Sequence, residues 1–416
     1  MSGSGPQTVR RPPAIVLVGT LDTKGHEYAY LRDRIRDAGG EAILVDAGVL
    51  GEPQVHADIS REEVARAAGA DHAELARAAD RGQAVEAMGH GAREVLSRLY
   101  AEGVLQGAAA VGGSGNSSIA AAAMRDLPIG VPKLIVSTVA SGDTRPYVGA
   151  KDLTMMYSVV DIAGINQISS QILANAAGAI VGMTRAGSTV AVNGKPLVGA
   201  TMFGVTTAGV DRARERLEEL GYEVLVFHAT GTGGQSFEAL ATGGFLAGAL
   251  DMTTTELADE LVGGVLSAGP DRLEAVGRSG IPQVVSLGAL DMVNFGPADS
   301  VPDKFAERNL YVHNPMITLM RTTPAENAEL GRQIGRKLNA ADSPTALFVP
   351  LGGVSAIDVE GQPFHDPEAD AALFHSLRKA IDPNKVEVHE VDANINDPAF
   401  ATAMAERLHE LIEERR

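Results

Sequence analysis

Residues 14–25 read AIVLVGTLDTKG, a run of five apolar residues that passes directly into a loop bounded by two glycines. A continuous apolar run of this length is typical of a strand buried on both faces of a parallel sheet. Helical spacing follows over residues 26–38, and apolar residues 42–45 predict a second strand. The unit has about the length that a right-handed crossover between parallel strands requires.

The same alternation of strand, glycine-containing loop and helix continues along the chain. The predicted strands cover residues 14–18, 42–45, 108–111, 134–136, 200–205, 223–227, 283–286, 346–349 and 386–391. Longer helices are predicted over residues 83–99, 162–183 and 398–414. This order predicts an α/β fold with two Rossmann-like subdomains, whose parallel sheets we expect to face an interdomain cleft.

The expected domain boundary lies where glycine, asparagine and proline interrupt the pattern. A chain of 416 residues also exceeds the usual size of one compact core. We predict a disordered tail over residues 1–13, a nucleotide-binding subdomain over 14–184, a linker over 185–199 and a second subdomain over 200–416.

Composition narrows the classes of partner. The formal charge of −18 disfavours binding to nucleic acid or anionic lipid, because both carry negative charge. The absence of cysteine excludes disulfides, thiolate zinc sites and cysteine nucleophiles. No stretch is typical of a secretion signal or a membrane span, so we expect a cytoplasmic protein with no membrane partner.

The loop after the first predicted strand lies where α/β proteins bind phosphate. Its glycines allow the backbone to approach a phosphate, Lys24 adds positive charge, and Asp22 suits Mg²⁺ or a ribose hydroxyl. The alternative is a plain strand-to-helix turn with a solvated lysine. The candidate binding residues here are Gly19, Thr20, Asp22, Thr23, Lys24 and Gly25.

Two further strand-end loops are expected beside the first, because the carboxyl ends of parallel strands meet at one edge of the sheet. The loop GGSGNS at 112–117 suits a second phosphate, and the loop from 137 to 142 would close the pocket. The alternatives are helix caps by serine or by Asp143. Asp46 stands where a Rossmann acid meets ribose, or is a turn residue. The candidate residues of the two loops are Gly112, Gly113, Ser114, Gly115, Asn116, Ser117, Ser137, Thr138, Ser141 and Gly142.

Acidic, basic and hydroxyl groups also gather at strand ends in the second half of the chain. The loop HATGTGG at 228–234 is typical of an anion site with an added imidazole. Residues 253–256 also fit a helix capping box, which is the alternative for that stretch. No spacing of ligating residues supports a metal site. The candidate catalytic residues are His228, Asp251, Glu256, Asp291 and Arg321.

Several long motifs together resemble a known family. The stretches GTLDTKGHE at 19–27, GGSG at 112–115 and HATGTGG at 228–234, with residues 251–261 and 284–296, resemble the Tm-1-like ATP-binding domain family. That family is named after a plant resistance protein against tomato mosaic virus. The resemblance covers residues 14–411 and implies two Rossmann-like subdomains, ATP as ligand, Mg²⁺ with it, and a homodimer or higher homo-oligomer.

Three functions are compatible with these features. The first is an ATP-dependent enzyme of small-molecule metabolism, with ATP on the N-terminal loops and substrate in the interdomain cleft. The second is a non-catalytic ATP-binding regulatory protein that acts on a protein partner, as the resemblance implies for the plant member. The third is a nucleotide-sugar enzyme of two-Rossmann architecture, against which the 4% aromatic content argues mildly.

Overall fold

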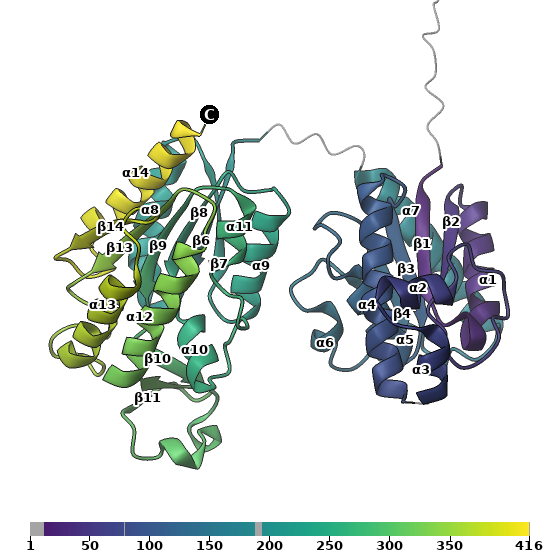
Figure 1. Ribbon diagram of the computed structural model, residues 1–416, viewed down its shortest axis with the longest axis horizontal. Coiled ribbons are helices and arrows are strands. Elements are labelled where there is room, and N and C mark those ends of the chain that lie inside the picture. Colours follow the sequence, from purple (N-terminus) through teal and green to yellow (C-terminus); the bar gives the residue numbers. More distant parts are fainter. Residues whose placement is uncertain (1–11, 79, 188–193, 416) are drawn as a thin grey trace, which may run out of the picture. The chain divides into compact units, whose positions relative to one another are not determined.

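The computed structural model describes residues 12–78, 80–187 and 194–415, which fold as two compact units, Met1–Val192 and Asn193–Arg416. Figure 1 shows the helices and strands of each unit. The predicted linker contains the division between the units, although a helix of the first unit continues to residue 187. Most of the predicted N-terminal tail, and residues 188–193 of the predicted linker, lie outside the described residues.

The N-terminal unit contains a five-stranded parallel sheet in the order β2-β1-β3-β4-β5. Its strands are β1 (Ala14–Gly19), β2 (Glu41–Asp46), β3 (Gly107–Gly112), β4 (Lys133–Ser137) and β5 (Thr154–Tyr157). Its helices are α1 (Leu21–Asp37), α2 (Arg61–Ala67), α3 (His72–Ala78), α4 (Arg81–Ala101), α5 (Ser114–Met124), α6 (Arg145–Val148) and α7 (Gln167–Gly187). The sequence did not predict β5, because this edge strand is only half-buried and lacks a continuous apolar run.

Alternation along the strands explains the two layers of helices in this unit. Val16 and Val18 pack against α4 and α5 on one face, whereas Ile15 and Leu17 pack against α1 and α7 on the other. Alanines at 108, 109 and 110 keep the central strand β3 narrow, so helices approach the sheet from both sides. This small-residue core explains how the fold forms with few aromatic side chains.

The C-terminal unit contains a six-stranded parallel sheet in the order β14-β13-β9-β8-β6-β7. These strands are β6 (Leu197–Met202), β7 (Glu223–His228), β8 (Gly248–Thr253), β9 (Gln283–Gly288), β13 (Thr345–Pro350) and β14 (Glu387–Val391). The helices are α8 (Thr207–Glu219), α9 (Thr232–Thr242), α10 (Glu256–Val262), α11 (Ala275–Ser279), α12 (Pro324–Asn339), α13 (Pro367–Ala380) and α14 (Pro398–Glu414), with short 3₁₀ turns η1 (Gly204–Thr206), η2 (Ala298–Ser300) and η3 (Asp303–Phe305).

A small antiparallel sheet in the same unit was not predicted. It has the order β10-β12-β11 and contains β10 (Met292–Phe295), β11 (Leu310–Asn314) and β12 (Ile317–Arg321). The structure also adds β8 to the predicted strands, a buried strand whose Asp251 breaks the apolar run. None of the helices in the described part of the chain combines the length and apolar character that crossing a bilayer demands.

Strand order locates one topological switch point in each large sheet. The chain leaves β1 for β2 on one side and then returns to β3 on the other, so the carboxyl ends of β1 and β3 flank the first switch point. The corresponding pair in the second sheet is β6 and β8. Ligands of open parallel sheets bind at such points, because the two connecting loops diverge and leave a crevice.

Candidate functional site

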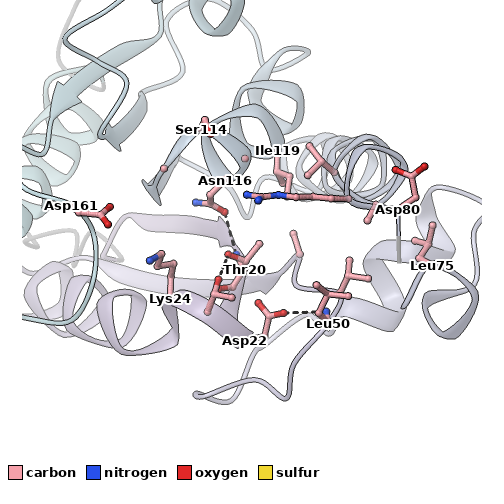
Figure 2. Close-up of a pocket in the computed structure, with 18 residues that line it drawn as sticks. Thr20, Asp22, Lys24, Leu50, Leu75, Asp80, Ser114, Asn116, Ile119 and Asp161 are labelled. Carbon is pink, nitrogen blue, oxygen red and sulfur yellow. Dashed lines mark hydrogen bonds between the residues drawn. The ribbon is translucent and has the colours of Figure 1, made fainter. Parts of the chain in front are cut away.

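A pocket of about 470 Å³ lies at the first switch point, within the usual size range of small-molecule sites. It is formed by the loops after β1, β2 and β3, by the start of α4 and by Asp161 (Figure 2). Eight of the predicted binding residues line it: Thr20, Asp22, Thr23, Lys24, Gly113, Ser114, Gly115 and Asn116. The first two predicted phosphate loops therefore meet in one pocket.

The other predicted binding residues do not line this pocket. Gly19, Gly25 and Gly112 lie against Tyr28, Gln54 and Asn116, where an added methyl group would collide with these neighbours. Ser117 and Ser137 are buried and share a hydrogen bond of 2.7 Å, which joins the first turn of α5 to the end of β4. Four more predicted residues do not line the pocket: Asp46, Thr138, Ser141 and Gly142.

Several backbone donors of the first loop already have acceptors within the protein. The chain becomes helical at Leu21, rather than near residue 26, with a kink at Lys24. Thr20 N donates to Asn116 Oδ1 at 3.2 Å, Leu21 N donates to Asp46 Oδ1 at 3.1 Å, and Lys24 N donates to Thr20 O at 2.9 Å. These three N–H groups are therefore not free for a phosphate, whereas Thr20, Asp22, Thr23 and Lys24 line the pocket.

A buried tyrosine fixes the two loops to each other. Tyr28 Oη donates to Val18 O at 2.6 Å and accepts from Val111 N at 3.0 Å and from Asn116 Nδ2 at 2.8 Å. Desolvation raises the pKa of the Tyr28 hydroxyl far above its usual range, so the group stays protonated. Tyr28 thus joins β1 to β3 and holds Asn116, which in turn caps Thr20.

Free backbone donors are found instead at the start of α5. Ser117 N donates to Gly113 O at 2.9 Å, whereas Ser114 N, Gly115 N and Asn116 N have no acceptor in the described ranges. The N-cap residue is Gly113, whose lack of a side chain rules out the predicted serine cap. An eleven-residue helix with three unsatisfied N–H groups at its first turn presents partial positive charge to the pocket.

Two cationic side chains lie in the pocket. Lys24 Nζ donates to Ile162 O and retains further donors. Arg81 makes no hydrogen bond or ion pair with any described residue, and its Nη2 lies 3.3 Å from the position of a methyl group built on Gly115. The guanidinium therefore stands beside the free N–H groups of α5.

The sequence prediction missed Arg81. Asp80 caps α4 by accepting from Gly82 N at 2.9 Å and from Gln83 N at 3.1 Å, so Arg81 is the first residue of that helix. A cation there is opposed by the positive end of the helix dipole, which makes an arginine immediately after a capping aspartate an informative signal.

The part of the pocket away from Lys24 is lined mostly by apolar residues, with Asp80 among them (Figure 2). Figure 2 shows Leu50 and Leu75 on the side away from Lys24 and Asp161. Leu50 borders the pocket and is 76% exposed. The apolar wall consists of Ala47, Val49, Leu50, Leu75, Ala84, Val85 and Ile119. The pocket therefore pairs a cationic, donor-rich end with a wall suited to an uncharged ligand group.

Two N–H groups of the anion site predicted at residues 228–234 are occupied by a carboxylate of the chain itself. Glu256 Oε1 accepts from Gly231 N at 2.7 Å and from Gly234 N at 3.0 Å, and Glu256 Oε2 accepts from Arg272 Nε at 2.7 Å. Arg272 also binds both carboxylate oxygens of Asp251, at 2.5 and 2.7 Å. Asp251 and Glu256 are buried, and the capping box predicted from Thr253 is wrong because Thr255 precedes α10.

Asp291 and Arg321 belong to a second buried cluster. Arg321 Nη2 binds Asp370 Oδ1 at 2.7 Å and Asp358 Oδ1 at 3.3 Å, while Ser355 Oγ donates to Asp291 Oδ2 at 2.8 Å. Burial raises the pKa of Asp291 to about 6, and burial together with the neighbouring carboxylates raises the pKa of Asp358 to about 8. The guanidinium of Arg321, a predicted catalytic residue, is thus directed at internal carboxylates.

His228 is the exposed member of the predicted catalytic set. Its ring lies edge-on to Phe203, with 5.4 Å between the ring centroids. Across the described ranges, no group of three or more histidine, aspartate or glutamate side chains is arranged to hold a metal ion. Within the predicted catalytic set, His228 is thus an exposed imidazole, whereas the other four side chains lie in two buried ion-pair clusters.

The two open parallel sheets and the switch-point pocket define a two-domain α/β protein of Rossmann-like type. The chain belongs to the uncharacterised protein family UPF0261, whose N-terminal domain matches residues 13–189 and whose C-terminal domain matches residues 195–412. A UPF0261 protein of Clostridium tetani (strain Massachusetts / E88) is 55% identical over 399 residues, covering 96% of this chain and 99% of the relative.

The family resemblance predicted from the motifs is confirmed. The ToMV resistance protein Tm-1(GCR237) of Solanum lycopersicum is 40% identical over 420 residues, covering 96% of this chain and 56% of the tomato protein. Among solved structures, the UDP-N-acetylglucosamine 2-epimerase of Rickettsia bellii covers 97% of both chains at 10% identity, with a TM-score of 0.23. A likeness at that level carries no functional argument.

Proposed function

We propose that this chain is an ATP-binding protein whose nucleotide occupies the switch-point pocket of the N-terminal unit. The observation that carries the proposal is the set of three unsatisfied N–H groups at the start of α5, with the unpaired Arg81 guanidinium beside them. Helix N-termini and arginine side chains are the two donors that proteins use most readily for phosphate. Lys24 also lines the pocket and adds a second cation (Figure 2).

The apolar wall indicates that the ligand has an uncharged part in addition to phosphate. A base and ribose offer flat, weakly polar faces that fit against aliphatic side chains such as Leu75, Val85 and Ile119. Inorganic phosphate would leave that wall exposed to water and gain nothing from it. This pairing of surfaces favours a nucleotide over a small anion.

We propose, as a finer step, that the bound ATP is consumed in small-molecule metabolism. Incubation with ATP, Mg²⁺ and metabolite pools, followed by chromatographic measurement of ADP, AMP and phosphate, tests this step. Release of any of these products above the rate seen with an Arg81→Ala variant supports an enzyme. Nucleotide binding with no product from any pool would contradict the proposed enzymatic activity and leave the binding proposal intact.

A second candidate, nucleotide binding without turnover, is favoured by a specific observation. Four of the five predicted catalytic side chains, Asp251, Glu256, Asp291 and Arg321, are buried in internal hydrogen bonds and ion pairs. The tomato relative is named as a resistance protein, which concerns that protein alone and motivates the search for a macromolecular partner. Partner capture that requires ATP, without product release, is the expected result for this candidate.

The experiment that tests the binding proposal is calorimetric titration of the full chain with ATP, ADP, inorganic phosphate and a UDP-sugar. We expect saturable binding of ATP and much weaker binding of phosphate. Tighter binding of the UDP-sugar than of ATP would replace the proposal with the nucleotide-sugar reading. No binding of any of the four ligands would refute it.

A further inference from the structure

The loop after β2 provides three residues of the apolar wall, Ala47, Val49 and Leu50. Ala47 is 1% exposed, whereas Leu50 is 76% exposed and is the one exposed member of the wall. Removal of apolar surface from water is favourable in proportion to the area removed. A ligand that rests on the wall therefore gains more from contact with Leu50 than from contact with Ala47.

Asp22 binds this loop through its side chain and its backbone. Asp22 Oδ2 accepts from Leu50 N at 3.2 Å and from Gly51 N at 3.1 Å, and Figure 2 shows the bond to Leu50. Asp22 O accepts from Gln54 Nε2 at 2.9 Å. Both ends of the segment from residue 50 to residue 54 are therefore joined to the first turn of α1.

The other carboxylate oxygen of Asp22 is covered by the same loop. Asp22 Oδ1 is buried and has no hydrogen-bond partner among the described residues. A methyl group built on Gly48 would lie 2.8 Å from Asp22 Oδ1, so only glycine at this position lets the loop pack so closely against the carboxylate. One oxygen thus binds the loop and the other is packed against it, as expected of a group that fixes the position of a loop.

We propose that Asp22 is a positioning residue, which holds Leu50 where its side chain covers the uncharged part of the ligand. Leu50 then selects a nucleotide over a bare polyphosphate, because only the nucleotide has a base and a ribose for it to cover. The sequence alone suggested Mg²⁺ or a ribose hydroxyl as the ligand of Asp22. Binding of Mg²⁺ requires the charge of the carboxylate, whereas positioning of the loop requires only an acceptor oxygen. The selectivity of Leu50 rests on the proposed nucleotide function, whereas the positioning of the loop by Asp22 does not.

The first experiment measures the exchange of backbone amide protons in the ligand-free protein. Asp22→Ala removes the acceptor of Leu50 N and Gly51 N, whereas Asp22→Asn keeps an acceptor oxygen. We expect faster exchange at residues 50 and 51 in Asp22→Ala and unchanged exchange in Asp22→Asn. Asp58→Ala is the control, because Asp58 accepts from Leu44 N in the same unit. Exchange at residues 50 and 51 that is the same in Asp22→Ala and in the wild type overturns the positioning role.

The second experiment measures the dissociation constants of ATP and of inorganic tripolyphosphate by calorimetry, in one buffer that contains Mg²⁺. Leu50→Ala should weaken ATP binding about tenfold and leave tripolyphosphate binding unchanged, because the lost side chain contacts only the uncharged part of the ligand. Asp22→Ala should give the same pattern, and Asp22→Asn should bind both ligands as the wild type does. Ile168→Ala is the control, because Ile168 is 48% exposed on α7 and does not line the pocket. Melting temperatures establish that each variant is folded.

The double variant Asp22→Ala/Leu50→Ala tests whether the two residues act together. If Asp22 acts through Leu50, the double variant binds ATP no more weakly than Asp22→Ala alone. Multiplied effects, or weaker tripolyphosphate binding in Asp22→Ala, show that Asp22 acts on the ligand itself and overturn the inference.

Unchanged ATP binding in Leu50→Ala also overturns the inference and leaves the nucleotide site standing. A wild type that binds no ATP refutes the proposed function, and the selectivity of Leu50 with it. In that case the exchange experiment still decides whether Asp22 positions the loop.

Discussion

Single residues decide which part of the pocket can accept an anion. Gly113 leaves α5 without a cap, Gly115 leaves space in front of its first turn, and Arg81 borders that space. Lys24, which the sequence alone favoured as the phosphate cation, donates to a backbone carbonyl in addition to lining the pocket. The two cations therefore differ in how completely they are available to a ligand.

The Arg81→Ala change is expected to weaken ATP binding about tenfold. A hydrogen bond to a charged group contributes about 1.5–3 kcal/mol, and the exposure of Arg81 places its value at the lower end. Calorimetry measures the dissociation constant. Arg66→Ala is the control, because Arg66 is exposed on α2 and lies outside the pocket. Equal affinities for the two variants would mean that Arg81 does not contact the ligand.

The Gly115→Ala change tests the proposed phosphate position by filling space and leaves the charge of the pocket unchanged. The added methyl group enters the space between Arg81 and the start of α5, so ATP affinity should fall although alanine favours the helix. Gly178→Ala on α7 adds the same methyl group where no atom lies within 4 Å. Both variants should melt at or above the wild-type temperature, and unchanged affinity in Gly115→Ala would place the phosphate elsewhere.

At the scale of elements, the two units differ in what accepts from the N–H groups at a helix N-terminus. In the N-terminal unit the helix after β3 begins with free N–H groups. In the C-terminal unit, Gly231 N and Gly234 N at the start of α9 donate to Glu256, which Arg272 neutralises. One helix start is open to a ligand, and the other has an internal carboxylate in the position where a ligand would bind.

Removing Arg272 is expected to destabilise the C-terminal unit strongly. Arg272→Met leaves the buried charges of Asp251 and Glu256 uncompensated, at a cost of about 3–5 kcal/mol. Arg278→Met is the control, since the exposed pair of Arg278 with Glu274 is worth about 0–1 kcal/mol. Urea unfolding measures both. A loss below about 1 kcal/mol for Arg272→Met would contradict a structural role for the cluster.

The cluster around Arg321 predicts how stability depends on pH. Folding raises the pKa of Asp358 to about 8 and that of Asp291 to about 6, from about 3.9 in an unfolded chain. Between these limits the folded state binds more protons, so the free energy of unfolding should fall as pH rises from about 4 to 8. Asp358→Asn should flatten this slope in urea titrations at several pH values, and the exposed Asp299→Asn should not.

At the scale of the whole molecule, the ligand site belongs to one of two units that have separate cores. Binding of a ligand stabilises the elements that contact it, by linkage. In hydrogen exchange, ATP should therefore slow exchange at the start of α1, α4 and α5. The Arg81→Ala variant at the same ATP concentration is the control. Slowed exchange confined to residues 228–262 would move the nucleotide to the C-terminal unit.

The sequence by itself determined the elements whose signals are local. Buried strands such as β1 and β3 are continuous apolar runs, and the glycine loops after them mark the switch point. The edge strand β5 and the small antiparallel sheet were missed, because half-buried strands depend on neighbours more than on their own pattern. The family, the two units and eight pocket residues followed from motifs alone.

Only the tertiary structure decided which glycine loop is open. Asn116 and Asp46 accept from two backbone donors of the loop after β1, and Glu256 accepts from two at the start of α9. Each of these acceptors comes from another part of the chain, so no local pattern reveals that the loops are filled. Arg81 likewise lines the pocket only because folding brings α4 next to loops that are distant from it in sequence. A motif specifies which donors exist, whereas folding decides whether a protein group or a ligand accepts from them.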